Sequence, residues 1–242
     1  MLTRPVRGRD EIADALRAAG ALVDAVPLIQ IVPPRDELAL QSAALAAGTS
    51  DWIVFTSANG VAAFASVRRE PLGARTNIAA IGPATAAAVE TLLSRHAPLV
   101  PETHVAESLA DALISAGPAR GGIALFQAQE ARPVLARLLR AAGFSVTATA
   151  AYATLESPPA DLVKHVRDAQ AIVLTSGSGA RALARGLAED PGLRALTGKT
   201  IACIGAVTAG EARRLGIEVA VTAQSASARG LVEALAAHRT LA

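Results

Sequence analysis

The stretch Trp52-Ile53-Val54-Phe55-Thr56-Ser57-Ala58-Asn59-Gly60 recurs later in the chain as Ala171-Ile172-Val173-Leu174-Thr175-Ser176-Gly177-Ser178-Gly179. Two further pairs of segments repeat at nearly the same spacing of about 120 residues, namely 78–85 with 201–208 and 16–20 with 139–143. This period indicates two copies of one domain-sized α/β unit. We expect two similar lobes and, between them, a cleft for a small ligand.

Composition favours a globular protein and excludes several other classes. The 242 residues are 52% hydrophobic and 18% charged, which is enough apolar sequence for two ordinary cores. The only cysteine, Cys203, lies in an apolar run and is predicted to be a reduced core thiol. With a net charge of +2 and 2% aromatic residues, the chain lacks the clustered charge and stacking surface of a nucleic-acid binder.

The chain has neither a signal-like apolar segment at its N-terminus nor an apolar run of about 18 residues. We therefore expect a cytoplasmic protein without a membrane anchor.

Short apolar runs alternate with Ala/Leu/Arg-rich segments of helical period, which is typical of parallel βαβ units. Gly20, Gly143 and Gly216 follow expected helix ends, where a left-handed residue is favoured. Ten strands in two parallel five-stranded sheets are predicted near residues 2–4, 22–31, 52–55, 78–81, 98–100, 123–126, 145–151, 171–175, 200–204 and 217–221.

Proline pairs at 33–34 and 158–159 interrupt this pattern twice, which predicts two chain crossings between the lobes. One lobe is then inserted, over residues 38–151. The other is discontinuous and combines residues 1–33 with 157–242. Residues 34–37 and 152–156 are the predicted linkers.

The repeated motifs follow strands and begin helices, at the sheet edge where parallel α/β proteins bind ligands. Backbone N–H groups and hydroxyls at a helix N-terminus hold a carboxylate or phosphate well. The alternative is that these residues only cap their own helices. The candidate binding residues are Ser57, Asn59, Thr85, Ser176, Ser178 and Thr208.

Tyr152 is the only tyrosine and ends the predicted strand 145–151. Its phenol can donate a proton or hydrogen bond to a ligand, although a half-buried ring at a hinge is an equal alternative. The Gly177-x-Gly179 pattern lacks the acidic residue of a dinucleotide site at the end of the next strand. The four histidines are His96, His104, His165 and His238, and no metal-ligand spacing links them. We therefore expect neither a metal nor a cofactor.

An ordered set of motifs along the whole chain resembles uroporphyrinogen-III synthase. The motifs are Thr3-Arg4-Pro5, Pro27-Leu28-Ile29, residues 54–61, Ile81-Gly82-Pro83-Ala84-Thr85, Ala106-Glu107-Ser108-Leu109, Ala151-Tyr152-Ala153-Thr154 and residues 204–209.

The resemblance implies a monomeric, cofactor-free enzyme with two flavodoxin-like lobes joined by a two-stranded connector. Its substrate is hydroxymethylbilane, a linear tetrapyrrole with eight carboxylates, which loses water and closes with ring D inverted to give uroporphyrinogen III. Tyr152 would donate a proton to the departing hydroxyl. The candidate binding residues named above, together with Arg4, would bind the carboxylates and pyrroles of the substrate. We also expect transient contact with hydroxymethylbilane synthase, the enzyme that makes this unstable substrate.

The chain departs from the family pattern at two places. Met1-Leu2 is a short stub where a longer first strand is usual in the family, so we expect that the start codon was assigned too late. Gln127-Ala128 replaces an Arg-Gly pair, which predicts weaker carboxylate binding. Two alternatives are a non-catalytic two-lobed receptor for a small polyanion and an interaction protein that has lost its ligand.

Overall fold

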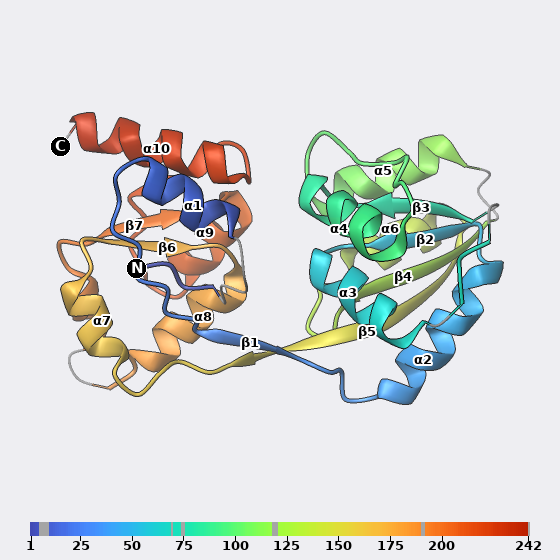
Figure 1. Cartoon of the computed structure of the whole chain (residues 1–242), viewed down its shortest axis with the longest axis horizontal. Helices are drawn as coiled ribbons and strands as arrows, with labels where there is room; N and C mark the ends of the chain where they lie inside the picture. The colour runs from blue at the N-terminus through green and yellow to red at the C-terminus, as the bar shows by residue number, and fades with distance from the viewer. Residues whose placement is uncertain (5–9, 69, 74–75, 118–120, 190–191, 242) are drawn as a thin grey trace. The chain divides into compact units, whose positions relative to one another are not determined.

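The computed structural model (Figure 1) describes residues 1–4, 10–68, 70–73, 76–117, 121–189 and 192–241, so Pro5 of the Thr-Arg-Pro motif lies outside the described residues. Contacts divide the chain into two units. Unit 1 combines Met1–Gln30 with Leu155–Ala242, and unit 2 is Ile31–Thr154. The chain passes from one unit to the other within strands β1 (Ile29–Val32) and β5 (Ser145–Glu156), which are neighbours in sheet order.

The described elements alternate along the chain as expected for an α/β protein. They are α1 Glu11–Ala18, β1, α2 Glu37–Ala46, η1 Ala47–Thr49, β2 Trp52–Phe55, α3 Ala58–Val67, β3 Asn77–Ala80, α4 Pro83–Leu93, α5 Ala106–Ala116, β4 Gly122–Ala128, α6 Val134–Ala141, β5, α7 Leu162–Asp168, β6 Ala171–Leu174, α8 Gly177–Gly186, η2 Gly192–Leu196, β7 Thr200–Cys203, α9 Ala206–Arg214, β8 Val221–Thr222 and α10 Ala228–Leu241.

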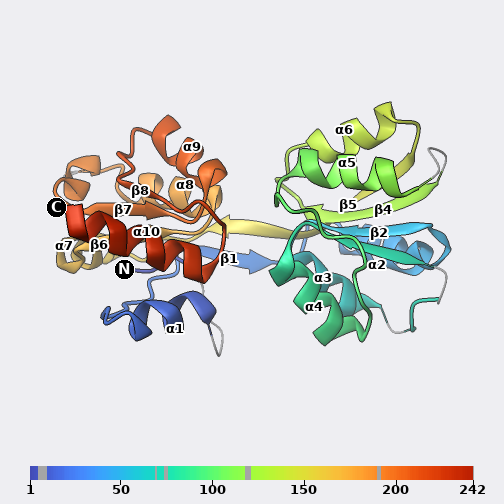
Figure 2. The ribbon, with the colours of Figure 1, turned by 90° about the horizontal axis from the view of Figure 1, so that it is seen from above.

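The sheet of unit 2 has the strand order β1-β5-β4-β2-β3, and β2 pairs in parallel with both β3 and β4. Side chains alternate between its faces, so that Ile53 and Phe55 pack with α2, α3 and α4, whereas Trp52 and Val54 pack with α5 and α6. Figure 2 shows α5 and α6 on one side of this sheet and α3 and α4 on the other. The strands are therefore covered on both faces, as parallel strands require.

All six Phe, Trp and Tyr residues of the chain belong to unit 2. Phe55, Phe64 and Phe126 form a cluster with ring centroids 4.8–5.7 Å apart. Unit 1 fills its cores with aliphatic side chains, including Leu162, Leu183 and Ile201.

Unit 1 contains a parallel three-stranded sheet, β6-β7-β8, in place of the predicted five strands. Leu2 lies next to β6, where a fourth strand would lie, but it forms only isolated bridges to Val173 and Ala25. Its N–H donates to Asp24 O at 2.8 Å and its O accepts from Val26 N at 2.9 Å. The predicted strand 2–4 and the first part of the predicted strand 22–31 thus pair over too few residues to form ladders, whereas the end of the latter, from Ile29, is in β1. The stub Met1-Leu2 is bonded on both sides.

The predicted strand 98–100 is likewise reduced, since Leu99 forms a single bridge to Ala79. The five-stranded sheet of unit 2 is completed by β1 instead. The strand predicted at 217–221 is displaced to β8, where two residues pair with β7. These segments lie at sheet edges, where few ladder hydrogen bonds define a strand.

The predictions for three glycines and for the cysteine are confirmed. Gly20, Gly143 and Gly216 have φ of +85°, +94° and +80°, the left-handed conformation that ends a helix. Cys203 is fully buried in the core of unit 1, and burial raises the pKa of its thiol to about 11. Among the described residues, none of the helices is long and apolar enough to cross a membrane.

Candidate functional site

The repeated motifs lie at the carboxyl edge of each parallel sheet. In unit 2, β2 and β3 end side by side with Phe55 paired to Ala80, and Ile81 N donates to Phe55 O at 3.0 Å. In unit 1, β6 and β7 end in the same way, and Ile204 N donates to Leu174 O at 3.0 Å. Each unit therefore places two helix N-termini next to each other at one edge.

In unit 2, Ser57 is the N-cap of α3, and its Oγ accepts from Gly60 N at 3.1 Å. The same hydroxyl donates to the Tyr152 hydroxyl oxygen at 3.0 Å. Its single proton is therefore directed at Tyr152. Asn59 lies exposed in the first turn of the same helix.

Tyr152 lies within β5, at the level where the neighbouring strand β4 ends. The register between β4 and β5 shifts between Gln127 and Ala128, so that Ala128 pairs with Tyr152. Gln129 N donates to Tyr152 O at 2.7 Å, which fixes the backbone there. The residue is 9% exposed and packs in the core that contains the phenylalanine cluster. The Gln127-Ala128 departure thus coincides with the irregularity that sets the position of the tyrosine.

In unit 1, Ser176 caps α8 in the way that Ser57 caps α3, accepting from Gly179 N at 3.0 Å. Its second partner is Ser178, whose Oγ lies 3.0 Å from the Ser176 Oγ. Buried Thr3 lies beside this turn, and its hydroxyl donates to Val173 O at 2.7 Å. The two predicted serines therefore lie together.

Thr85 and Thr208 occupy equivalent positions in the first turns of α4 and α9. The preceding Gly82 and Gly205 are N-caps without a side-chain hydrogen bond. The threonines are 4% and 6% exposed, and within the described part of the chain neither hydroxyl has a hydrogen-bond partner. Unlike the two serines, these hydroxyls are not used to cap their helices, so they remain available to a ligand.

A charged cluster that the sequence reasoning missed lies beside the Ser176 turn. Arg181 of α8 contacts Glu156 Oε1 at 3.3 Å and Glu211 Oε1 at 3.0 Å. Arg214 also binds Glu211 at 2.9 Å. Hydrogen bonds from Arg214 and Arg181 lower the pKa of Glu211 to about 2. The i, i+3 spacing of Glu211 and Arg214 was visible in the sequence, but the contacts of Arg181 join distant segments.

Arg4 and two histidines also make specific contacts. Arg4 Nε lies 3.3 Å from Asp10 Oδ2, and Asp10 is the N-cap of α1. His165 contacts Asp24 at 2.8 Å and Asp161 at 3.4 Å. His104 lies over Gly82, where an added Cβ would come within 3.0 Å of its ring. The described residues contain no group of side chains suited to a metal.

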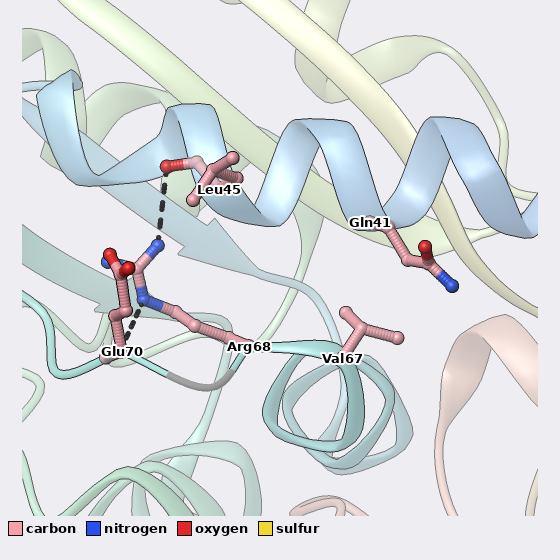
Figure 3. Close-up of a pocket in the computed structure, with 5 residues that line it drawn as sticks. All are labelled: Gln41, Leu45, Val67, Arg68 and Glu70. Atoms are coloured by element: carbon pink, nitrogen blue, oxygen red, sulfur yellow. Dashed lines mark hydrogen bonds between the residues drawn. The ribbon is translucent and has the colours of Figure 1, made fainter.

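A pocket of about 260 Å³ lies elsewhere on unit 2, lined by Gln41, Leu45, Val67, Arg68 and Glu70 (Figure 3). Arg68 donates to Ala44 O and, at 3.4 Å, to Leu45 O, so it caps the carbonyl end of α2. Ser57 and Val67 lie at opposite ends of ten-residue α3, about 15 Å apart along its axis. This pocket is therefore separate from the sheet edge that holds the repeated motifs.

Comparison with known proteins identifies relatives over nearly the whole chain. The family model of uroporphyrinogen-III synthase HemD matches residues 10–233. The uroporphyrinogen-III synthase of Synechococcus elongatus is 29% identical over 248 residues, which cover 97% of this chain and 93% of that protein.

Two solved structures share the fold. A mutant uroporphyrinogen III synthase from Thermus thermophilus superposes with a TM-score of 0.65 at 17% identity, covering 100% of this chain and 98% of that chain. The enzyme from Helicobacter pylori 26695 gives a TM-score of 0.61 at 16% identity, covering 90% of this chain and 93% of that chain.

Proposed function

The chain belongs to the uroporphyrinogen-III synthase family and is an enzyme of tetrapyrrole biosynthesis, and on this premise we propose how its residues act on hydroxymethylbilane. The hydroxyl of the hydroxymethyl group of this linear tetrapyrrole leaves as water, and its methylene carbon stays on the pyrrole. The resulting azafulvene is attacked at the substituted carbon of ring D, and the spiro intermediate fragments and recloses with ring D inverted. The product is uroporphyrinogen III.

The binding task falls to the four helix N-termini at the carboxyl edges of the two sheets. A carboxylate at a helix N-terminus gains about 0.3–1 kcal/mol when exposed and up to about 2 kcal/mol when partly buried. Ser57 and Ser176 contribute by holding their turns in place, and Thr85 and Thr208 contribute hydroxyls that have no hydrogen-bond partner among the described residues. Asn59, Ser178 and Arg4 supply further donors at or near these turns.

The chemical task falls to Tyr152, whose position supports a role as proton donor. Its ring is held in the core of unit 2, while its hydroxyl meets Ser57 at the N-terminus of α3. The substrate closes unaided to the type I isomer, so the enzyme must chiefly hold a conformation and assist departure of the hydroxyl. The hydrogen bond between Ser57 and Tyr152 is the observation that carries this assignment.

The test supplies freshly generated hydroxymethylbilane and separates the oxidised products by isomer. We expect the wild type to give mainly type III. Tyr152→Phe removes the phenol proton and is expected to lower kcat by about a hundredfold, the lower end of general acid catalysis, while the product remains type III. If the wild type gives only type I at the spontaneous rate, the chain does not convert hydroxymethylbilane and the proposal fails.

A further inference from the structure

The hydrogen bond between Ser57 and Tyr152 uses the proton of Ser57 and leaves the phenol proton of Tyr152 unused. A phenol carries one proton and can also accept a hydrogen bond at its oxygen. Here the oxygen accepts from Ser57 at 3.0 Å, so the contact leaves the phenol proton unused. Ser57 in turn accepts from Gly60 N at 3.1 Å. The three groups form a directed chain, from backbone N–H to serine to tyrosine.

We propose that Ser57 is a positioning residue that aligns and polarises the Tyr152 hydroxyl, rather than a direct carboxylate ligand. Its one proton cannot serve Tyr152 and a substrate carboxylate at the same time. Hydrogen bonds in a chain strengthen one another, so the Gly60 N–H makes Ser57 a better donor to the phenol oxygen. This inference rests on the proposed role of Tyr152 as proton donor.

The chain of hydrogen bonds matters most when the proton leaves. The C–O bond of the hydroxymethyl group breaks, and the oxygen keeps the electron pair, takes the phenol proton and departs as water. The pyrrole nitrogen supplies electrons to the new exocyclic double bond and takes a positive charge, while a negative charge remains on the phenol oxygen. Ser57 and the positive end of α3 stabilise that charge. The phenolate regains a proton at the final reclosure, when the unsubstituted α-carbon of ring D forms its new bond and loses its hydrogen as a proton.

The duplicated turn supplies a matched control. Ser176 caps α8 at 3.0 Å as Ser57 caps α3, yet its second partner is Ser178 and unit 1 contains no tyrosine. Ser57→Ala and Ser176→Ala therefore both remove a cap, and only the first removes a contact with the phenol. Each variant is combined with Tyr152→Phe.

The expected result is a specific coupling between Ser57 and Tyr152. Ser57→Ala should lower kcat by about fivefold to tenfold, the range of one hydrogen bond, with the product still type III. In the Tyr152→Phe background it should have little further effect, whereas the effects of Ser176→Ala and Tyr152→Phe should multiply. Ser57→Thr, which keeps a capping hydroxyl, should restore most of the rate.

A spectroscopic readout separates this role from a structural one. The chain has a single tyrosine, so the tyrosine doublet of its Raman spectrum reports the hydrogen bonding of Tyr152 alone. The intensity ratio of the doublet should change in Ser57→Ala and not in Ser176→Ala. An unchanged ratio, or effects of Ser57→Ala and Tyr152→Phe that multiply, overturns the role of Ser57. Formation of type I alone by the wild type would instead overturn the proposed function itself.

Discussion

The β2–α3 turn of unit 2 and the β6–α8 turn of unit 1 perform the same backbone task with different second partners. Both serines cap their helices at nearly equal distances, 3.1 Å for Ser57 and 3.0 Å for Ser176. Beyond the cap, Ser57 meets a phenol and Ser176 meets another serine. The helix cap is therefore common to both copies of the repeat. The second hydrogen bond of each serine differs between the copies.

The apolar cores of the two units also share their arrangement and differ in their side chains. Each unit has apolar clusters on both faces of its sheet, but the aromatic side chains are confined to unit 2. Three predictions test how far the likeness between the units extends.

The largest effect is expected from core truncation. Phe64 is fully buried between Phe55 and Phe126, and Phe64→Ala should lower the free energy of unfolding of unit 2 by about 3–5 kcal/mol. Leu183→Ala, in the aliphatic core of unit 1, should cost about 2–5 kcal/mol. Urea unfolding followed by far-ultraviolet circular dichroism measures both. If the units unfold independently, each substitution lowers one transition and leaves the other in place, whereas one shared transition shows that they unfold together.

A smaller effect concerns the two unpartnered threonines. Thr85→Val and Thr208→Val preserve shape and remove a hydroxyl that has no hydrogen-bond partner among the described residues. Stability should therefore change little, because no hydrogen bond within the protein is lost. KM for hydroxymethylbilane should rise by about twofold to tenfold, the worth of one hydrogen bond. A loss of stability without a change in KM would show that the hydroxyls serve the fold and not the ligand.

The smallest effect is the pH dependence that Glu211 gives to unit 1. Hydrogen bonds from Arg214 and Arg181 lower its pKa from 4.5 to about 2, so the folded state binds this proton less readily than the unfolded state. The stabilisation is fully present above pH 4.5 and is lost as the pH falls towards 2. Glu211→Gln should be less stable than the wild type at pH 7, and this difference should shrink through that window.

Urea unfolding at pH 7 and at several values down to the folded pKa of about 2 follows this change. Glu233→Gln is the control, because its pair with Arg229 is highly exposed and contributes little. A difference between wild type and Glu211→Gln that is constant with pH contradicts the linkage.

Much of the fold could be predicted from the apolar runs. Four expected strands correspond to β2, β3, β4 and β6, and most of their ends agree to about one residue: 52–55, 78–81, 123–126 and 171–175. Each of these strands is buried on both faces, so its sequence is a continuous apolar segment. The outer segments 2–4 and 98–100 were predicted as strands and form only bridges, and of the predicted strand 22–31 only the end, from Ile29, lies in a strand, β1. An apolar pattern signals burial, but not how many hydrogen bonds a neighbouring segment makes.

The candidate site was predictable one residue at a time and not as a set of contacts. Ser57 and Tyr152 stood out through a repeated motif and a unique residue type, yet they are 95 positions apart, and their meeting depends on the register of β4 against β5. Arg181 carried no such signal. Its partners come from β5 and α9, so the charged cluster exists only once the chain has folded.

The confinement of the aromatic residues to unit 2 determines which part of this protein optical spectroscopy reports. Tryptophan and tyrosine emission, and near-ultraviolet dichroism, arise entirely from residues 52–152, because unit 1 carries no chromophore of this kind. A melting curve recorded by intrinsic fluorescence therefore reports unit 2, and opening of unit 1 passes unseen. A single tryptophan placed in the aliphatic core of unit 1 would give that half of the chain its own optical signal.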